Sequence, residues 1–426
     1  MKAPIIYNLF PRLLGHMGRW GTHAGRAKEM GFNWIFINPI QYPGFSGSLY
    51  AIKDLYRLNP LFIPPNATDP LAELGKTIDA LHDQGLQIMM DLVINHTSKD
   101  SELIKDHPSW FRRDKNGAVV SPSAIDPADS RTLTVWGDLA EVDNANSSDR
   151  QGLWAYWTAM VQYHLDLGLD GFRCDAAYKV PRLLWQQLIE TARKRHPSVV
   201  FAAETLGCRL AEVKQLENAG FDFLFNSSKW WNFDAPWCLE QHRDFQHVAP
   251  SISFPESHDT PRLMQQTGGL IQVQKQRYAF AALFSTGLLM PIGYEFCFTK
   301  KLDVVRTTPQ DWETTNHDLS VFIKEVNRIK QSMPIFGVEG QWEVVTSLSG
   351  ATTILTKRAE GVQPVVVVIN KDWLNPQSVT LPPLNKLLGQ QGRLLRPFRE
   401  GRNSALPIIN SPLLLDPAEV ALLVCG

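Results

Sequence analysis

Cysteine is scarce in this sequence of 426 residues, which holds only five, far apart along the chain: Cys174, Cys208, Cys238, Cys297 and Cys425. An odd number of scattered cysteines argues against a disulfide framework and a zinc ribbon, and it fits reduced thiols in a cytoplasm. Long apolar runs are missing too, because none reaches the about 18 residues that a membrane span needs. The N-terminal segment lacks the apolar core of a secretory signal, so we expect a cytoplasmic protein.

The chain also lacks an excess of charge of either sign. Lysine and arginine number 42 and aspartate and glutamate 43, which gives a formal net charge of −1. No net field attracts nucleic acid or an anionic membrane, so neither is an expected partner. Hydrophobic residues make up 44% and charged residues 20% of the chain. This composition is typical of a soluble globular enzyme, and the length favours one large domain with a smaller one attached.

Eight short apolar runs alternate with segments of helical periodicity. They lie at 4–10, 32–40, 86–94, 169–175, 198–204, 221–226, 251–259 and 286–295. Several are continuous, as expected of strands buried on both faces, and strands that alternate with helices form a parallel sheet. Eight such units, over the roughly 250 or more residues typical of that fold, indicate a closed (β/α)8 TIM barrel of the α/β class. An open doubly wound sheet is the alternative, but no glycine-rich phosphate turn follows the first run.

Two stretches interrupt this rhythm. The polar segment after "DLVINH" is too long for a plain barrel loop, so we expect a short inserted subdomain at 97–151, on the loop of the third strand. From 335 onward the pattern changes to short alternating runs such as "TTILTKR" and "PVVVVIN", which is typical of an antiparallel β-sandwich. We therefore predict a catalytic barrel at 1–96 and 152–334 and a C-terminal β-sandwich at 335–426.

Polar side chains gather where four of the predicted strands end. These residues are Asp91, Asn95 and His96 on the third strand, Arg173 and Asp175 on the fourth, Glu204 on the fifth, and His258 and Asp259 on the seventh. Taken alone, each could be a helix cap or a core residue. Because catalytic residues of a barrel lie at the carboxyl ends of its strands, we expect the whole set to meet at one rim. Several acids placed together there favour an active site.

The predicted rim fits glycoside hydrolysis with retention of configuration. That reaction uses one carboxylate as nucleophile and a second carboxylic acid to protonate the leaving oxygen. Residues i and i+2 of a strand point to the same face, so we expect Arg173 to lie beside Asp175 and to keep it ionised. Glu204 follows the apolar run "VVFAA", with no charge beside it, which suits a proton donor.

The motifs "DLVINH", "GFRCD", "FAAE" and "FPESHD", in this order, resemble the four conserved regions of the α-amylase family of glycoside hydrolases. The resemblance covers essentially the whole chain, from the barrel and its insertion to the C-terminal β-domain. It implies Asp175 as the nucleophile and Glu204 as the general acid/base. It also implies Asp259 as the third carboxylate, which holds the ring hydroxyls in the distorted transition state.

The same resemblance implies a binding pocket around the reacting glucosyl unit. It places Arg173, His96 and His258 along that pocket. The stretch "SLYAIKDLY" resembles the family's segment after the second strand, with Tyr50 as the ring stacked under the sugar and Asp54 as a structural acid.

The chain departs from this family after the nucleophile. Tyr178 and Lys179 stand where the starch-cutting members carry adjacent Lys and His, which contact the next sugar and help to bind calcium. We expect Tyr178 and Lys179 to make an altered contact with that sugar. Asn95 matches a calcium ligand of the family, and both a structural calcium ion and a plain hydrogen bond stay open for it. No cofactor is required by the expected reaction.

The segment "KWWNFDAPW" after the sixth strand is rich in aromatic residues: Trp230, Trp231, Phe233 and Trp237. Trp230 and Trp231 are candidates for stacking on sugars at the acceptor side, and packing of the loop on the barrel rim is the alternative. The stretches "YPGFSGSLYAIKDLYRLNP" and "AETLGC" are similar to the family branch of maltosyltransferases that use maltose 1-phosphate. No phosphate-binding cluster can be assigned from the sequence.

The expected function is a retaining glycoside hydrolase that cleaves α-glucosidic bonds of oligosaccharides or small glucosides through a covalent intermediate on Asp175. A transglycosylase of the same family, such as a glucosyl- or maltosyltransferase that uses a sugar phosphate, is the alternative. A non-catalytic carbohydrate-binding barrel would be expected to lack one of the three acids, and all three are present. A barrel enzyme of phosphate-sugar metabolism would need a glycine-rich anion site, which "TPRL" and "GYEF" do not supply. Substrate length, linkage and oligomeric state are not determined by the sequence.

Overall fold

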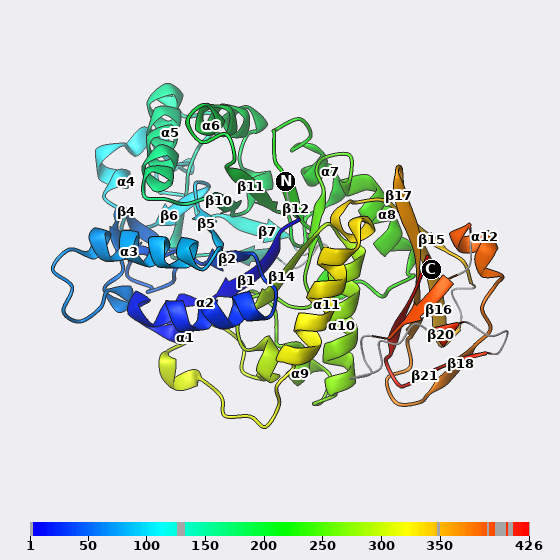
Figure 1. The fold of residues 1–426 in the computed structure, drawn as a ribbon. Helices are drawn as coiled ribbons and strands as arrows, with labels where there is room; N and C mark the ends of the chain where they lie inside the picture. The colour runs from blue at the N-terminus through cyan, green and yellow to red at the C-terminus, as the bar shows by residue number, and fades with distance from the viewer. Residues whose placement is uncertain are drawn as a thin grey trace.

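The computed structural model describes residues 3–125, 133–346, 350–389, 392–396, 406–407 and 412–425. Eight parallel strands close into a barrel (Figure 1). They are β1 (Ile5–Leu9), β2 (Trp34–Ile37), β5 (Gln87–Leu92), β10 (Gly171–Cys174), β11 (Val200–Glu204), β12 (Phe223–Phe225), β13 (Ser251–Ser253) and β14 (Gly287–Pro291). Each of the eight predicted apolar runs contains one of these strands, so the predicted TIM barrel is confirmed.

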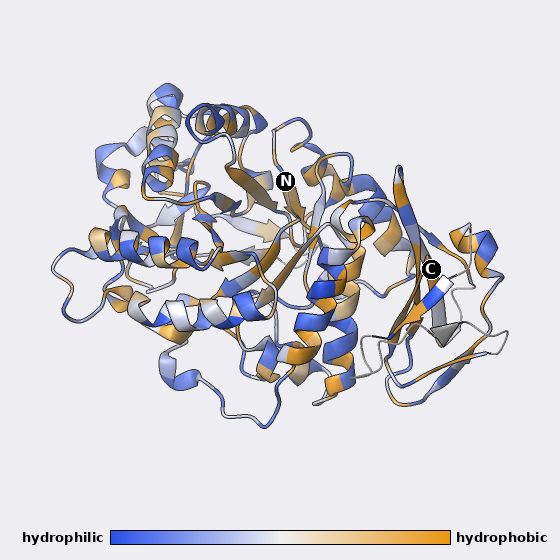
Figure 2. Cartoon of the chain, viewed as in Figure 1, coloured by the Kyte–Doolittle hydropathy of each residue, from blue (hydrophilic) through white to orange (hydrophobic). Residues whose placement is uncertain are grey.

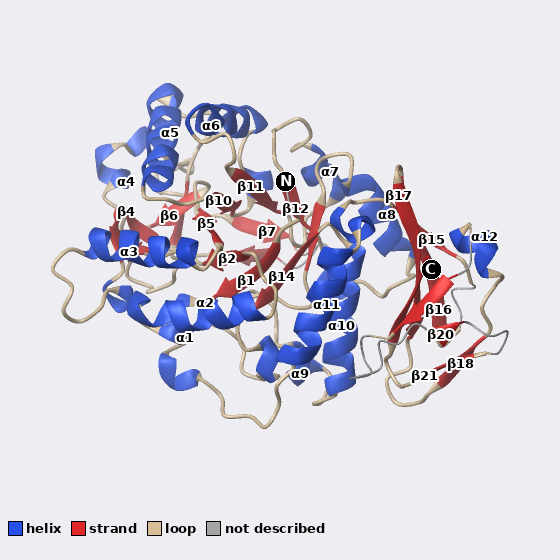
Figure 3. Cartoon of the chain, in the orientation of Figure 1, coloured by secondary structure: helices blue, strands red, loops and turns tan. Residues whose placement is uncertain are grey.

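Helices form a ring outside the barrel (Figure 3). The longer ones are α2 (Trp20–Glu29), α3 (Pro70–Asp83), α5 (Arg150–Asp166), α6 (Arg182–Arg195), α8 (Pro236–Phe245), α10 (Ile271–Phe284) and α11 (Ser320–Ser332). The short ones are α1 (Pro11–Leu14), α4 (Leu103–Asp106), α7 (Leu210–Lys214), α9 (Leu263–Gln266) and α12 (Leu384–Leu388). Within the described ranges, no helix combines the length and the apolar character needed to cross a membrane.

Helix α3 illustrates how local sequence sets these elements. Asp69 caps its first turn, because the side-chain Oδ1 accepts hydrogen bonds from the N–H groups of Leu71 and Ala72. Leu74, Ile78 and Leu81 recur at helical spacing and are buried against the barrel.

The barrel strands are buried on both faces, which explains their continuous apolar sequences. Side chains inside the barrel form one cluster of Ile6, Trp34, Phe36, Met89, Val200, Ala202, Phe223, Phe225, Ile252, Phe254 and Leu289. The outward-facing side chains pack against the helices in a second, larger core. In Figure 2 the barrel strands are accordingly mostly hydrophobic, whereas the helices turn hydrophilic residues outward.

Small sheets rise from the loops that follow β2 and β5. After β2, β3 (Gln41–Pro43) pairs with β4 (Ile52–Leu58). Between β5 and α5, where the sequence predicts an inserted subdomain, β6 (His96–Ser98) pairs with β9 (Leu139–Glu141), and β7 (Ser123–Ile125) pairs with β8 (Leu133–Val135). Part of the predicted range, 126–132, lies outside the described residues.

The C-terminal part is antiparallel, as predicted. Its larger sheet contains β15 (Gln341–Val344), β16 (Thr352–Ala359), β17 (Val362–Asn370), β22 (Val420–Cys425), β19 (Gly392–Leu395) and β20 (Leu406–Pro407) in that spatial order. Strands β18 (Gln377–Val379) and β21 (Leu413–Leu415) form a second, two-stranded sheet, and an apolar cluster lies between the two. Residues 347–349, 390–391, 397–405, 408–411 and 426 of the predicted range lie outside the described residues.

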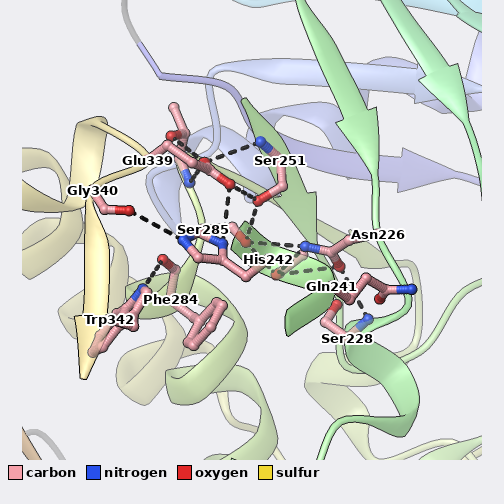
Figure 4. Close-up of polar contacts among 12 residues, drawn as sticks. Asn226, Ser228, Gln241, His242, Ser251, Phe284, Ser285, Glu339, Gly340 and Trp342 are labelled. Carbon is pink, nitrogen blue, oxygen red and sulfur yellow. Dashed lines mark hydrogen bonds and ion pairs between the residues drawn. The ribbon is translucent and has the colours of Figure 1, made fainter. Parts of the chain in front are cut away.

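A buried polar network fastens this domain to the base of the barrel (Figure 4). Glu339, in the connection before β15, accepts hydrogen bonds from the N–H of Ser251 over 3.0 Å and from Oγ1 of Thr286 over 2.8 Å. Nδ1 of His242 lies 3.3 Å from the same carboxylate. Burial alone would raise the pKa of Glu339, but His242, the Ser251 hydroxyl and the charge of Lys357 bring it down to about 2. Glu339 is therefore ionised beside the amino ends of β13 and β14.

The carboxyl end of α10 depends on residues from outside the helix. The Phe284 carbonyl accepts hydrogen bonds from Nε1 of Trp342 over 3.1 Å and from Nζ of Lys357 over 2.9 Å. Lys330 of α11 donates to the carbonyls of Ala282 and Ser285, both over 2.8 Å. The last carbonyls of a helix lack partners of their own, so these side chains complete the helix.

Candidate active site

The polar residues that the sequence predicts at one rim do lie together. Asp91 and Arg173 are in β5 and β10, Asp175 follows β10 directly, and Glu204 is the last residue of β11. His258 and Asp259 lie in the loop after β13. Neighbouring parallel strands end at the same edge of the barrel, so their terminal side chains converge.

Arg173 occupies the centre of this group and is buried. Its Nη1 donates to Oδ1 of Asp91 over 2.5 Å and to Oδ1 of Asp175 over 3.2 Å. Its Nη2 lies 3.7 Å from Oδ2 of Asp259. Burial opposes the charge of Arg173, but the surrounding carboxylates, Asp91 foremost, hold its pKa well above the usual range. One guanidinium thus balances three acids, which belong to β5 and to the connections after β10 and β13.

The sequence places Asp91 at the predicted rim but does not predict its pairing with Arg173. We expected Arg173 to lie beside Asp175 and keep it ionised. Its shorter hydrogen bond is instead to Asp91, on the adjacent strand β5. Burial raises the pKa of Asp91 to about 7, and the Arg173 guanidinium opposes this rise. One nitrogen of Arg173, Nη1, therefore serves both Asp91 and Asp175, while Nη2 faces Asp259.

Glu204 is buried at the end of β11. Its Oε2 accepts a hydrogen bond from the N–H of Ala176 over 3.0 Å, and its Oε1 accepts one from the N–H of Leu206 over 2.7 Å. Burial raises the pKa of Glu204 to about 7, the charges of Asp175 and Asp259 add to the rise, and Arg173 opposes it. The Glu204 carboxyl can therefore hold a proton near neutral pH.

Tyr50 lies beside this group, held by its hydroxyl. The hydroxyl oxygen is 2.7 Å from Oδ2 of Asp91 and 2.7 Å from Nε2 of His258, and it accepts a hydrogen bond from Nδ2 of Asn38 over 3.0 Å. Burial raises the pKa of Tyr50 well above its usual value, so the phenol stays protonated. The Tyr50 ring is stacked on the His258 ring, with centroids 5.7 Å apart and planes at 7°.

The two histidines are buried and neutral. Nε2 of His96 lies 3.1 Å from the main-chain oxygen of Tyr50, and burial lowers the pKa of His96. Nε2 of His258 lies 3.1 Å from Oδ2 of Asp259, and burial lowers the pKa of His258 to about 4. Both therefore offer hydrogen-bonding groups without a charge.

A cavity opens over these residues. Its polar lining comes from Arg173, Glu204, Ser257, His258 and Asp259, and its apolar lining from Phe36, Leu206, Phe225, Phe254 and Leu289. The cavity is small, and its apolar lining belongs to the core inside the barrel.

The aromatic residues after β12 separate into two kinds. The side chains of Trp230 and Trp237 are 51% and 42% exposed, whereas Trp231 and Phe233 are buried. Nε1 of Trp231 donates to Gln241 over 2.9 Å and its ring packs edge-on against Phe284. The prediction that Trp231 stacks on a sugar is therefore wrong, because no face of this indole is free.

Tyr178 and Lys179 line a groove next to the cavity. The groove is formed by Tyr178, Lys179, Val180, Pro181, Arg182, Leu183 and Gln215. It begins three residues after Asp175. Burial raises the pKa of Tyr178, and the nearby charge of Glu204 raises it further. The groove carries two cations, Lys179 and Arg182, and no carboxylate in its lining.

Calcium binding at Asn95 stays a prediction of the sequence. Calcium takes six to eight oxygen ligands, mostly carboxylates and carbonyls. The Oδ1 atom of Asn95 is buried without a hydrogen-bond partner, but the described parts of the chain contain no group of three or more His, Cys, Asp or Glu residues able to hold a metal. Asp54 accepts hydrogen bonds from the N–H groups of Tyr56 and Arg57, within the same strand β4.

Comparisons with known proteins agree with this fold. A family model described as the glucanotransferase domain of glycogen debranching enzyme matches residues 2–116. Over 417 residues the chain is 26% identical to the alpha-1,4-glucan:maltose-1-phosphate maltosyltransferase of Burkholderia pseudomallei, covering 94% of this chain and 36% of that protein. The crystal structure of an alpha-amylase from Lactobacillus plantarum superposes with a TM-score of 0.78 and 21% identity, covering 99% of both chains.

The chain is similar in sequence to members of the α-amylase family of glycoside hydrolases, and it shares the fold of solved alpha-amylases. Further relatives include the maltogenic alpha-amylase of Bacillus acidopullulyticus, 21% identical over 87% of this chain and 64% of that protein. The structure of a maltogenic alpha-amylase from Thermotoga neapolitana superposes with a TM-score of 0.77 and 20% identity, covering 100% and 99% of the chains. This chain spans about a third of the Burkholderia pseudomallei relative and 53% of a maltosyltransferase from Bifidobacterium animalis.

Proposed function

We propose that the chain is a retaining enzyme on α-glucosidic bonds that passes through a covalent glycosyl intermediate on Asp175. The proposal rests on one observation: the two neighbouring acids Asp175 and Glu204 have different surroundings. Asp175 accepts a hydrogen bond from a buried guanidinium, while Glu204 is buried with a pKa raised to about 7. A retaining mechanism needs one ionised and one protonated carboxyl group side by side.

In the first step Asp175 attacks the anomeric carbon of the sugar. An electron pair of its carboxylate forms the new C–O bond as the bond to the leaving oxygen breaks. Glu204 transfers its proton to that oxygen, so the leaving group departs as an alcohol and Glu204 becomes a carboxylate. Arg173 stabilises the charge of Asp175 before the attack and holds the carboxylate in place.

In the second step Glu204 acts as a base. It removes a proton from water or from a sugar hydroxyl, whose oxygen then attacks the anomeric carbon and releases Asp175. The original configuration returns because the carbon has been inverted twice. Asp175, Glu204 and Arg173 supply the charges of both steps, so the proposed reaction needs no cofactor.

The remaining pocket residues bind the sugar in this proposal. Asp259 accepts hydrogen bonds from ring hydroxyls, and the neutral His258 forms hydrogen bonds with them as well. Tyr50, bonded to His258, packs its ring against the apolar face of the sugar. His96 supports the Tyr50 main chain over 3.1 Å. These contacts strengthen as the ring flattens toward the oxocarbenium-like transition state.

The substrates we propose are α-glucans or smaller α-glucosides, and the acceptor is either water or another sugar. The names of the relatives include both maltosyltransferases and maltogenic amylases. The groove with Lys179 and Arg182 favours transfer from a sugar phosphate as the second candidate, because two cations without a lining carboxylate suit an anionic leaving group.

The test incubates the protein with maltooligosaccharides, with α-maltosyl fluoride and with α-maltosyl phosphate, and resolves the products by chromatography. Shorter sugars alone indicate hydrolysis, as does phosphate released from α-maltosyl phosphate together with free maltose, whereas longer sugars indicate transfer. Asp175→Asn should reduce turnover of every donor by about a thousandfold or more. If the wild-type protein turns over none of these donors, the proposed function is wrong.

Matched variants separate the two candidates. Lys179→Ala and Arg182→Ala should weaken use of the sugar phosphate by about tenfold each and leave the fluoride unaffected if the groove binds the phosphate. Equal effects on the two donors would count against the sugar-phosphate candidate.

A further inference from the structure

The loop that presents His258 and Asp259 is closed by an ion pair at its two ends. Nη1 of Arg262 donates to Oε1 of Glu256 over 2.7 Å, and both side chains are only 2% exposed. The other oxygen of Glu256 accepts a hydrogen bond from the N–H of Leu263 over 2.6 Å. The residues between Glu256 and Arg262 therefore form a short loop clamped at its base.

Arg262 also ties this loop to the segment that follows β14. Its Nη2 donates to the carbonyl of Ile292 over 2.9 Å and its Nε donates to the carbonyl of Lys300 over 3.1 Å. Every nitrogen of the guanidinium thus has an acceptor, two of them on a different strand–helix connection. The position of the loop is fixed against the neighbouring strand as well as within itself.

Inside the clamp the backbone makes a tight turn. The N–H of Ser257 donates to Oγ1 of Thr260 over 3.0 Å, and the N–H of Thr260 donates to the carbonyl of Ser257 over 3.2 Å. Lys229 donates to the carbonyl of Pro261 from outside the loop. These bonds set the direction in which His258 and Asp259 leave the backbone.

Asp259 itself has little support from side chains. Its side chain is 46% exposed, its ion pair with Arg173 spans 3.7 Å, and its carboxylate also lies 3.1 Å from Nε2 of His258, its neighbour on the same loop. Its placement must therefore come from the backbone that carries it. A buried ion pair adds little to stability because desolvation offsets the attraction, which favours a role for Glu256 and Arg262 in fixing geometry.

We propose that Glu256 and Arg262 are a positioning pair for the catalytic pocket, which sets Asp259 and His258 against the sugar. This inference rests on the proposed function, in which Asp259 holds the ring hydroxyls. Neither Glu256 nor Arg262 lines the cavity. They act only through the loop between them.

The experiment replaces both partners, Glu256→Leu with Arg262→Met, because removing one alone leaves an unpaired buried charge that threatens folding. We expect kcat for α-maltosyl fluoride to fall about 10- to 100-fold, since a misplacement of about 1 Å is enough for such a loss. In an Asp259→Asn background the same pair of changes should lower kcat by less than about threefold, because the residue that they position is already disabled.

The C-terminal domain offers a matched control. Nε of Arg396 donates to Glu419 over 2.7 Å, Glu419 also accepts from the N–H of Asp416, and Arg396 also donates to the carbonyl of Leu414. The double change Glu419→Leu with Arg396→Met removes an ion pair of the same kind away from the loop. It should leave kcat unchanged.

A crystal structure of the Glu256→Leu, Arg262→Met protein gives a readout that is independent of turnover. We expect the Asp259 carboxylate to move by more than about 1 Å. An unmoved loop, an equal loss of kcat in the Asp259→Asn background, or an equal loss in the control protein would each overturn the positioning role. If the wild-type protein were inactive, the proposed function would fail, and the crystal structure would still decide whether the pair positions the loop.

Discussion

The main-chain N–H of Ala176 donates a hydrogen bond of 3.0 Å to the carboxylate of Glu204. Ala176 follows Asp175 directly, so the backbone that carries one proposed catalytic acid also holds the other. Ala176 has φ 41° and ψ 48°, in the left-handed region that residues with a side chain rarely adopt. The turn after β10 is therefore a strained link between the two acids.

This strain predicts an order among substitutions at residue 176. Ala176→Gly should leave the free energy of unfolding unchanged or raise it by up to about 1 kcal/mol, because glycine adopts this conformation freely. Ala176→Val should lower it by about 1–2 kcal/mol, since a β-branched side chain resists positive φ, and should lower kcat by displacing the N–H from Glu204. Chemical denaturation and steady-state kinetics of both variants measure these effects. Equal stability of the two variants would contradict the left-handed geometry.

The pH dependence of the reaction should report the proton on Glu204. The pKa of this group is raised to about 7, and the proposed first step needs the protonated form. We expect kcat/KM for maltooligosaccharides to fall about tenfold per pH unit above pH 7. With α-maltosyl fluoride, whose leaving group needs less help from a proton, the fall should be smaller. The same steep fall with both donors would assign the basic limb to another group.

Stability should depend on pH through the same carboxyl. Because the folded pKa of Glu204 is about 7 and the usual value is 4.5, the folded protein binds this proton more tightly. Its contribution to stability is complete below about pH 4.5 and is lost as the pH rises through 7. Glu204→Gln should reduce the difference in unfolding free energy between pH 5 and pH 8 by about 2–3 kcal/mol. Parallel stability curves for the two proteins would argue that Glu204 is ionised throughout.

The network at the base of the barrel predicts the opposite dependence. The pKa of Glu339 is held at about 2, below its usual 4.5, so its stabilising effect is present above about pH 4.5 and disappears as the pH falls toward 2. Glu339→Gln should lower the unfolding free energy by about 2–3 kcal/mol at pH 7. The gap between variant and wild type should close on acidification. A gap of constant size between pH 7 and pH 3 would mean that the charge of Glu339 is unimportant.

Adjacent tryptophans should respond differently to truncation. Trp231→Ala removes a fully buried indole and should cost about 3–5 kcal/mol of stability. Trp230→Ala removes an indole that is half in solvent and should change stability by less than about 1 kcal/mol. If Trp230 stacks on an acceptor sugar, its loss raises KM for oligosaccharide acceptors. Thermal unfolding and acceptor kinetics of the two variants make the comparison.

The barrel could be predicted from the sequence because its strands are buried on both faces. Mostly apolar runs such as 86–94 and 198–204 are typical of fully buried strands, and the polar residues at or just after their ends, Asn95 and Glu204, mark the carboxyl ends. The hairpin of β3 and β4 could not be predicted in this way. Its pairing shifts register twice, so it lacks a clean alternation of apolar and polar residues.

The site was harder to predict wherever it depends on a neighbouring strand. Spacing along one strand shows that Arg173 and Asp175 share a face, but it cannot show that Asp91 takes the shorter bond. The same limit hides Asn38, which holds the Tyr50 hydroxyl. Trp230 and Trp231 differ in burial only because of the turn that they occupy, and their sequence context is the same.

The hydrogen bonds at the carboxyl end of helix α10 limit how far the chain can be truncated. The Phe284 carbonyl is bonded by Trp342 and Lys357, both of which belong to the C-terminal sheet. In a protein truncated after residue 334, the Phe284 carbonyl would lose both of its side-chain hydrogen-bond donors in an apolar environment. Ser251 and Thr286 would also lose their hydrogen-bond acceptor, Glu339. The barrel therefore depends on the C-terminal domain for its stability. A protein engineered to carry this site should include both the barrel and the C-terminal domain.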